Sequence, residues 1–162
     1  MNLVDTHAHL DLLKEDVGKA LGTAAQAEVT EVITIGISIE SSLKAVELAR
    51  RYPQVYAVVG MHPHDASLLD DAALKELRSM ASDPRVVGIG ETGLDFYRNL
   101  SPPQDQERAF RALVELAKEL DLPVVVHDRE AHADTMKILE EYAPFDGRLI
   151  MHCFSGDLAM AQ

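Results

Sequence analysis

Short runs of almost continuously apolar residues alternate with amphipathic stretches along the whole chain. Six of these runs are expected to be β-strands, and they cover residues 3–9, 32–37, 55–61, 86–91, 123–127 and 148–154. A strand that is apolar on nearly every residue is buried on both faces, which is typical of a parallel sheet covered by helices. The alternation therefore predicts an α/β fold.

The stretches between these runs carry apolar residues at helical spacing. Phe110, Leu113 and Ala117 recur on one face of one stretch, and residues 70–81 form another. Uninterrupted repetition of strand and helix predicts a barrel of the TIM type, (β/α)8. Such a barrel takes about 250 residues, whereas these 162 residues hold about six βα units. We expect residues 1–162 to form a single domain from which the C-terminal part of the barrel is missing.

The composition excludes several classes of protein. No apolar stretch approaches the roughly 20 residues that span a bilayer, so no membrane partner is expected. The single cysteine cannot form an internal disulfide and no signal peptide precedes the first strand, so a cytoplasmic location is expected. A formal net charge of −12 argues against a broad basic surface for nucleic acid. A phosphate substrate would therefore need local cations.

Histidines and one glutamate come at the ends of the apolar runs. They are His7 and His9 in the first run, Glu91 in the fourth, His127 in the fifth and His152 in the sixth. The carboxyl ends of parallel strands meet at one rim of a sheet, where α/β folds place their chemistry. Imidazoles and carboxylates are common ligands of divalent metals. The pattern therefore predicts a metallohydrolase centre at this rim.

Glu91 is expected to be central to this site. A carboxylate directly after a fully apolar strand is costly to bury without a cation, and its two oxygens allow it to bridge two ions. The alternative is a carboxylate that caps the next helix or pairs with an arginine. For His7 and His9, the alternative is a pair of buried histidines that bond to the backbone.

His62 and Arg129 are candidates for contact with a substrate. Pro63 holds His62 in an extended conformation, so its ring is expected to enter the site as a catalytic or substrate-binding group, whereas His64 is expected to face away. The guanidinium of Arg129, two positions after His127, suits a substrate phosphate. Its alternative is an ion pair at a helix end.

Two other catalytic motifs are excluded. Cys153 follows His152 on an expected strand and so points to the opposite face, which predicts a core thiol rather than a nucleophile. Gly88 and Gly90 lack the third glycine and the following helix of a dinucleotide-binding motif.

Five motifs, in order along the whole chain, carry a resemblance to a known family. They are residues 4–11 (VDTHAHLD), 60–64 (GMHPH), 90–97 (GETGLDFY), 123–131 (PVVVHDREA) and 152–156 (HCFSG). Together they resemble the TatD family of metal-dependent deoxyribonucleases, in the amidohydrolase superfamily. The resemblance implies a TIM barrel, a divalent-metal centre and hydrolysis of DNA, typically as an exonuclease.

The resemblance also implies a role for each matching residue. His7 and His9 would hold one metal ion, His127 and His152 would hold another, and Glu91 would bridge the two. A further family ligand, an aspartate in a Glu-Thr-Asp-x-Pro segment, has no match after His152. The chain resembles the first six βα units, so we expect weakened turnover, poor stability of the chain on its own, and self-association through open sheet edges.

These observations leave three hypotheses about the function. The first is a deoxyribonuclease that acts on DNA through water activated by two divalent ions, with Mg, Mn, Zn, Co or Fe all compatible with the ligands. The second is an amidohydrolase or lactonase that uses the same ligands on a small molecule. The third is a non-catalytic metal-binding fragment. No obligatory protein partner is expected.

Overall fold

Six parallel strands form one sheet in the computed structural model, which describes residues 2–162. The strand order in space is the order along the chain. The strands are β1 (Leu3–Ala8), β2 (Val29–Ile35), β3 (Val55–Val59), β4 (Val86–Asp95), β5 (Val124–Arg129) and β6 (Leu149–Met151). The six expected strands are thus confirmed, and each pairs only with its neighbours in the sequence.

Helices separate the strands, as the amphipathic stretches predict. The α-helices are α1 (Val17–Gln26), α2 (Ile39–Arg51), α3 (Asp71–Ala81), α4 (Pro103–Leu120), α5 (His132–Tyr142) and α6 (Leu158–Ala161), and the 3-10 helices are η1 (Leu10–Leu12) and η2 (Pro63–Leu68). Among the described residues, no helix combines the length and the apolar character that crossing a membrane requires.

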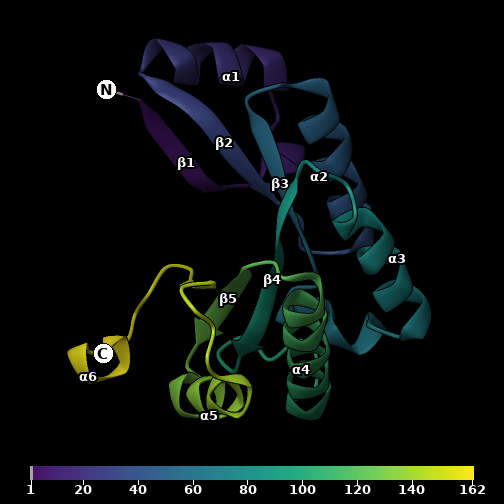
Figure 1. Ribbon diagram of the computed structural model, residues 1–162, viewed down its shortest axis with the longest axis vertical. Helices are drawn as coiled ribbons and strands as arrows, with labels where there is room; N and C mark the ends of the chain where they lie inside the picture. The colour runs from purple at the N-terminus through teal and green to yellow at the C-terminus, as the bar shows by residue number, and fades with distance from the viewer. Residues whose placement is uncertain (1) are drawn as a thin grey trace.

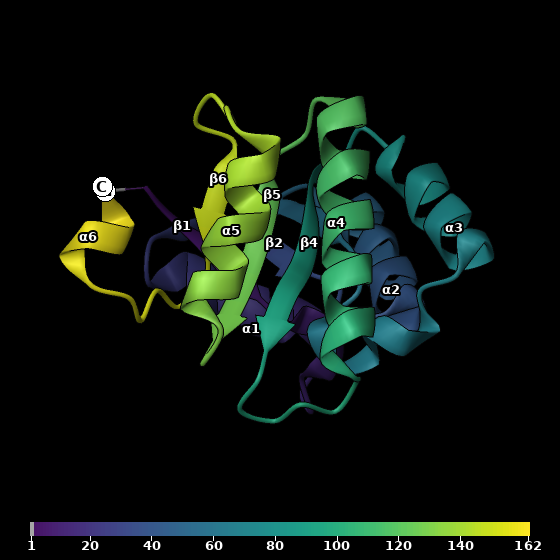
Figure 2. The ribbon, with the colours of Figure 1, turned by 90° about the horizontal axis from the view of Figure 1, so that it is seen from below.

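The sheet curls into a half-barrel of the TIM type, with helices on its convex side (Figure 1). Figure 2 shows α4 and α5 in front of β4 and β5, and α2 and α3 further along the same side. Parallel strands joined by helices allow this curvature because sheets twist in a fixed sense. The carboxyl ends of the strands therefore converge on one concave rim.

Apolar side chains fill both sides of the central strands. Phe110, Leu113 and Ala117 of α4 are fully buried in the larger core, between the helices and the sheet. A smaller cluster includes Ile35 of β2 and Val125 of β5. Because both faces are covered, the central strands need no polar face, which explains their continuous apolar runs.

The edge strand β1 departs from this expectation. Leu3 and Val4 are 38% and 48% exposed, so the prediction of burial on both faces is wrong for this strand. The reason is that β1 pairs with β2 alone and has no neighbour on its other side. β6 likewise pairs only with β5, and Ile150 is 50% exposed.

The bounds of β4 and β6 also differ from the prediction. β4 does not end at Glu91 but continues to Asp95, because residues 92–95 pair in register with residues 126–129 of β5. β6 spans only Leu149–Met151, so His152 lies in the turn after it. Glu91 is therefore an interior residue of the longest strand, next to β5.

A glycine allows β4 and β5 to approach closely at this level. Gly93 has a φ of +138°, and a Cβ placed on it would overlap the carbonyl oxygen of His127. Only glycine adopts this backbone conformation without strain. Gly93 therefore helps to set the position of His127 relative to Glu91.

Candidate metal centre

The predicted site residues gather around one cavity of about 420 Å³ at the concave rim. The residues around it include His9, His62, Glu91, His127, Arg129 and His152. His9 and His152 directly follow β1 and β6, and His62 precedes η2 after β3, whereas Glu91 lies inside β4 and His127 and Arg129 lie in β5. The convergence expected from parallel strand ends is thus present in the fold. His7 belongs to the same group of residues because its ring contacts Glu91, which lines the cavity.

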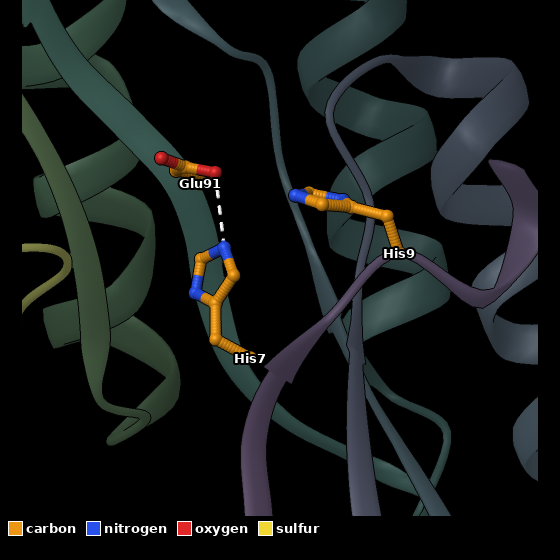
Figure 3. Close-up of side chains that lie close together, drawn as sticks. All are labelled: His7, His9 and Glu91. Atoms are coloured by element: carbon orange, nitrogen blue, oxygen red, sulfur yellow. Dashed lines mark ion pairs between the residues drawn. The ribbon is translucent and has the colours of Figure 1, made fainter.

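His7, His9 and Glu91 form the first cluster of possible metal ligands (Figure 3). Each offers one ligand atom, and these atoms lie within 4.8 Å of one another. The His7 Nε2 atom is 3.3 Å from Glu91 Oε2. His9 Nδ1 lies 3.0 Å from the carbonyl oxygen of Ile35, which can only accept, so Nδ1 donates and Nε2 keeps its lone pair.

His62, Glu91 and His127 form a second cluster by the same criterion. His127 Nδ1 lies 2.9 Å from Glu91 Oε1, whereas Oε2 is the oxygen that faces His7. The two oxygens of one carboxylate thus face two separate histidine clusters. This is the geometry in which a carboxylate can bridge two cations.

His152 approaches the first cluster from the far edge of the sheet. Its ring stacks on that of His7, with centroids 3.4 Å apart and an interplanar angle of 9°. Its backbone N–H donates to the carbonyl of Val126 at 2.9 Å, which ties the turn after β6 to β5. His152 lies beside the cavity but belongs to neither three-residue cluster.

The donor set fits a divalent cation. His7 Nε2 is buried and has no hydrogen-bond partner, although it faces Glu91. Buried polar atoms are normally bonded, so an unpaired imidazole nitrogen beside a carboxylate indicates a ligand position. Imidazole nitrogens with one carboxylate suit Zn, Mn, Co or Fe.

Electrostatics keep Glu91 negatively charged. The residue is only 3% exposed, and burial alone would raise the pKa of its carboxyl group. Contacts with His127 and His7 outweigh burial and hold this pKa far below its ordinary value. Burial also opposes the charge on His127, but its bonds to Glu91 and Asp95 raise the His127 pKa above its usual range.

His62 enters the site in a neutral form. Burial, reinforced by the charge of His127, lowers the pKa of His62 to about 4. The His64 backbone N–H donates to His62 Nδ1 at 3.2 Å, so the neutral ring carries its proton on Nε2. This tautomer makes His62 a hydrogen-bond donor, which favours contact with a substrate oxygen over ligation of a metal.

His64 does not face away, so that prediction is wrong. Its Nε2 lies 2.8 Å from Asp95 Oδ2, and its ring is centred 4.2 Å from that of His62. The cause is η2, which begins directly after His62 and turns the chain back, whereas the prediction assumed an extended segment.

Asp95 is the site residue that the sequence analysis missed. Its side chain is 1% exposed and contacts both His64 and His127. The apolar run predicts a strand over residues 86–91 only, so Asp95 falls outside the predicted strand. Two-residue alternation from Glu91 through Gly93 to Asp95 is the signal that would have placed both carboxylates on the same side.

Arg129 lies at the outer margin of the cavity. It is exposed, and its guanidinium carbon is 4.0 Å from the centroid of the Tyr97 ring. Within residues 2–162, no ion pair of Arg129 is found, so the alternative of a helix-end ion pair is not what the structure contains. The stacking holds the cation beside the histidine clusters.

Cys153 is exposed, so the prediction of a core thiol is wrong. The prediction assumed that the strand continues past His152. The strand ends at Met151 instead, and Cys153 adopts a left-handed turn conformation with a φ of +47°.

Comparison with known proteins gives consistent matches over almost the whole chain. A family model described as TatD related DNase matches residues 4–162. The 3'-5' ssDNA/RNA exonuclease TatD of Salmonella typhimurium is 39% identical over 148 residues, which are 91% of this chain and 57% of that protein. The uncharacterized metal-dependent hydrolase YabD of Bacillus subtilis is 34% identical over 162 residues, 99% of this chain and 64% of that protein.

A solved structure has the same fold. The crystal structure of YJJV, a TatD homolog from Escherichia coli K12, superposes with a TM-score of 0.87 at 31% identity. The match covers 98% of this chain and 62% of that one. The chain thus spans less than two thirds of the length of these relatives.

Proposed function

Because this chain belongs to the TatD related DNase family, we propose that it is a metal-dependent hydrolase that cleaves phosphodiester bonds of DNA, as an exonuclease. The relatives named 3'-5' ssDNA/RNA exonuclease TatD support single-stranded nucleic acid as the substrate class. One observation carries the proposal: the two oxygens of buried Glu91 face His7 and His127 separately. That arrangement suits two cations about one phosphate.

We assign the ligands as the family resemblance implies. His7 and His9 would hold one ion, His127 and His152 would hold the other, and Glu91 would contact both. Two bound divalent ions would supply a water of lowered pKa and polarise a phosphoryl oxygen. The orientation of His9 supports this assignment, because its bond to Ile35 leaves Nε2 free for a ligand role.

His62 and Arg129 are proposed to orient the substrate. The Nε2–H of neutral His62 suits a phosphoryl oxygen, and its low pKa keeps the ring uncharged near neutral pH. Arg129 suits a second phosphate, since stacking on Tyr97 restricts its guanidinium while leaving N–H groups available. A local cation such as Arg129 is what a chain of net charge −12 needs to attract DNA.

The other partner predictions stand as part of the same proposal. DNA is the substrate, and no obligatory protein partner is proposed. Self-association through the open edges of β1 and β6 is proposed because each edge strand pairs on one side only. Residues 1–162 are proposed to act as one domain, and the cytoplasmic location stays a prediction.

A nuclease assay tests the proposed function. The purified chain is incubated with Mn²⁺, Mg²⁺, Zn²⁺ or Co²⁺ and 5′-labelled single-stranded DNA, and products are resolved by length. We expect progressive shortening from the 3′ end that EDTA stops. Turnover of amides or lactones without DNA cleavage would favour the small-molecule hydrolase. Binding of two ions without phosphodiesterase activity at high protein concentration would favour the metal-binding fragment.

A further inference from the structure

A second buried carboxylate lies behind the proposed metal centre. Asp95 Oδ2 is 3.2 Å from His127 Nε2 and 2.8 Å from His64 Nε2. An ionised carboxylate can only accept hydrogen bonds, so both imidazole nitrogens must donate to it. Asp95 thus joins a proposed metal ligand, His127, to a histidine that has no assigned role.

The position of this carboxylate is fixed by the fold rather than by the two histidines. The backbone N–H of Asp95 donates to Gln106 Oε1 at 2.8 Å, and Gln106 Nε2 donates to the Ser101 carbonyl at 2.8 Å. Gln106 is fully buried in α4. The Arg98 backbone N–H donates to Asp95 Oδ1 at 2.7 Å. Oδ1 is therefore held by the backbone, and Oδ2 is left to face the imidazoles.

We propose that Asp95 is a positioning residue that orients the His127 ring so that its Nδ1 faces Glu91 as the metal-ligating nitrogen. The bond from His127 Nε2–H to Asp95 fixes the tautomer, and His127 Nδ1 lies 2.9 Å from Glu91 Oε1. An outer carboxylate of this kind sets the ring orientation and raises the basicity of a histidine ligand. The inference rests on the proposed metal centre and adds a residue to it.

The chain contains a matched carboxylate–imidazole pair for comparison. Asp128 is also buried, with a side chain 4% exposed, and its Oδ2 lies 2.6 Å from His132 Nδ1. Its other oxygen accepts from Thr135 Oγ1 at 3.3 Å. These contacts face α5 and include no proposed metal ligand. Asp128 also lines the cavity, so Asp128→Asn removes a buried charge near the site but leaves both hydrogen-bond partners of the His127 ring in place.

Calorimetric titration of Zn²⁺ into the metal-depleted protein tests the inference. We expect Asp95→Asn to bind Zn²⁺ about 10–100-fold more weakly than the wild type, and Asp128→Asn, which removes a nearby charge but no partner of His127, to bind it more tightly than Asp95→Asn does. Equal affinities of the wild type and Asp95→Asn overturn the positioning role alone. Failure of the wild type to bind Zn²⁺ at all contradicts the proposed metal centre instead, so the two failures are distinguishable.

A spectroscopic measurement on the unaltered protein decides the matter if Asp95→Asn does not fold, as judged by circular dichroism. Long-range ¹⁵N–¹H correlations of the Zn²⁺-loaded wild type report which nitrogen of the His127 ring is protonated. We expect the proton on Nε2, with Nδ1 unprotonated. The opposite tautomer overturns the inference.

Discussion

Glu91 carries a negative charge in a place where water barely reaches it. The carboxylate is 3% exposed and lies between His7 on one side and His127 on the other. In the protein without metal, the contacts with Glu91 and Asp95 raise the His127 pKa, which favours a positive charge on this ring beside the carboxylate. Divalent cations at the proposed metal centre would provide the same balance with a stronger field, so protons and metal ions would compete for this site.

Removing the charge of Glu91 should remove both metal binding and activity. Even the loss of an outer partner weakens metal affinity about 10–100-fold, so we expect Glu91→Gln, which alters a direct ligand, to weaken it by more than about 100-fold. Cleavage of labelled single-stranded DNA should fall to the level measured in EDTA. Asp128→Asn is the control for loss of a buried carboxylate. Full nuclease activity of Glu91→Gln would defeat the catalytic assignment.

The neutral state of His62 makes the metal-free protein less stable in acid. The His62 pKa is lowered from 6.5 to about 4, because burial and the charge of His127 disfavour the cation. Between these values the unfolded chain binds a proton that the folded chain does not, so stability falls as pH falls. We expect this residue to cost about 2 kcal/mol between pH 7 and pH 4.5.

The free energy of unfolding in urea, measured across this pH range for wild type and His62→Gln, isolates the effect. The variant lacks the titrating ring. As the pH falls, its free energy of unfolding should therefore decrease less than that of the wild type. Curves that run parallel from pH 7 to pH 4.5 would show that His62 titrates normally.

Among the strands, β4 contributes most to the geometry of the site. It is the longest strand, it pairs with both β3 and β5, and it carries Glu91 and Asp95 on one side. α4 packs over it and supplies Gln106, which bonds the Asp95 backbone. The geometry of the cavity therefore depends on how closely β4 and β5 approach.

Adding a methyl group to Gly93 should disturb this approach. Gly93→Ala places a side chain on a residue with a φ of +138° and against the His127 carbonyl oxygen. Strained backbone of this kind costs about 1–3 kcal/mol before any steric overlap, so we expect a loss of at least about 2 kcal/mol in unfolding free energy and weaker Zn²⁺ binding.

Gly22→Ala is the matched control for the Gly93 substitution. A Cβ on Gly22 has no neighbour within 4 Å, and the residue lies inside α1. Alanine should stabilise this helix position by about 0.5–1 kcal/mol. Equal stability of the Gly93→Ala protein and the wild type would mean that the strands separate without cost.

The sequence predicts the strands better than it predicts where they end. Continuous apolar runs identified all six strands, and burial on both faces explains these runs in the central strands but not in the edge strands β1 and β6. The end of β4 was missed because Gly93 and Asp95 are residue types that are rare in strands and typical of turns; pairing with β5 overrides that preference. For the same reason, Asp95 was not recognised as a site residue. The turn of His64 into the site depends on η2, whose short 3-10 geometry leaves no hydrophobic periodicity.

The curvature of the whole sheet brings residues at its two edge strands, β1 and β6, together at the site. His7 of β1 and His152 after β6 stack with ring centroids 3.4 Å apart, although they lie at opposite edges of the sheet. The backbone edges themselves remain open, since β1 and β6 do not pair with each other. Cations bound between the histidines would join the two edges.

Metal should therefore stabilise the whole half-barrel. A cation at 100 times its dissociation constant adds about 2.7 kcal/mol to the folded state, which corresponds to a rise in melting temperature of roughly 5–10 °C for a chain of this size. We expect a low melting temperature in EDTA and this increase with Zn²⁺ or Mn²⁺, measured by scanning calorimetry. A high, cooperative midpoint of a monomer that does not respond to metal would contradict the expectation of poor stability.

The open edges should also cause association. Ile150 is 50% exposed on edge strand β6, and a lysine there discourages pairing with another sheet. We expect Ile150→Lys to shift the chain toward monomer in light scattering coupled to gel filtration. Leu158→Lys, which changes a 73% exposed residue outside the sheet, should leave association unchanged. An equal effect of both substitutions would indicate general solubility rather than edge pairing.

Anomalous X-ray scattering from crystals grown with Mn²⁺ would locate the proposed ions themselves. We expect two peaks beside Glu91, one within coordinating distance of His7 and His9 and the other within coordinating distance of His127 and His152. Peaks elsewhere, or no peak at Glu91 in crystals that contain ordered Mn²⁺, would contradict a carboxylate that bridges two ions.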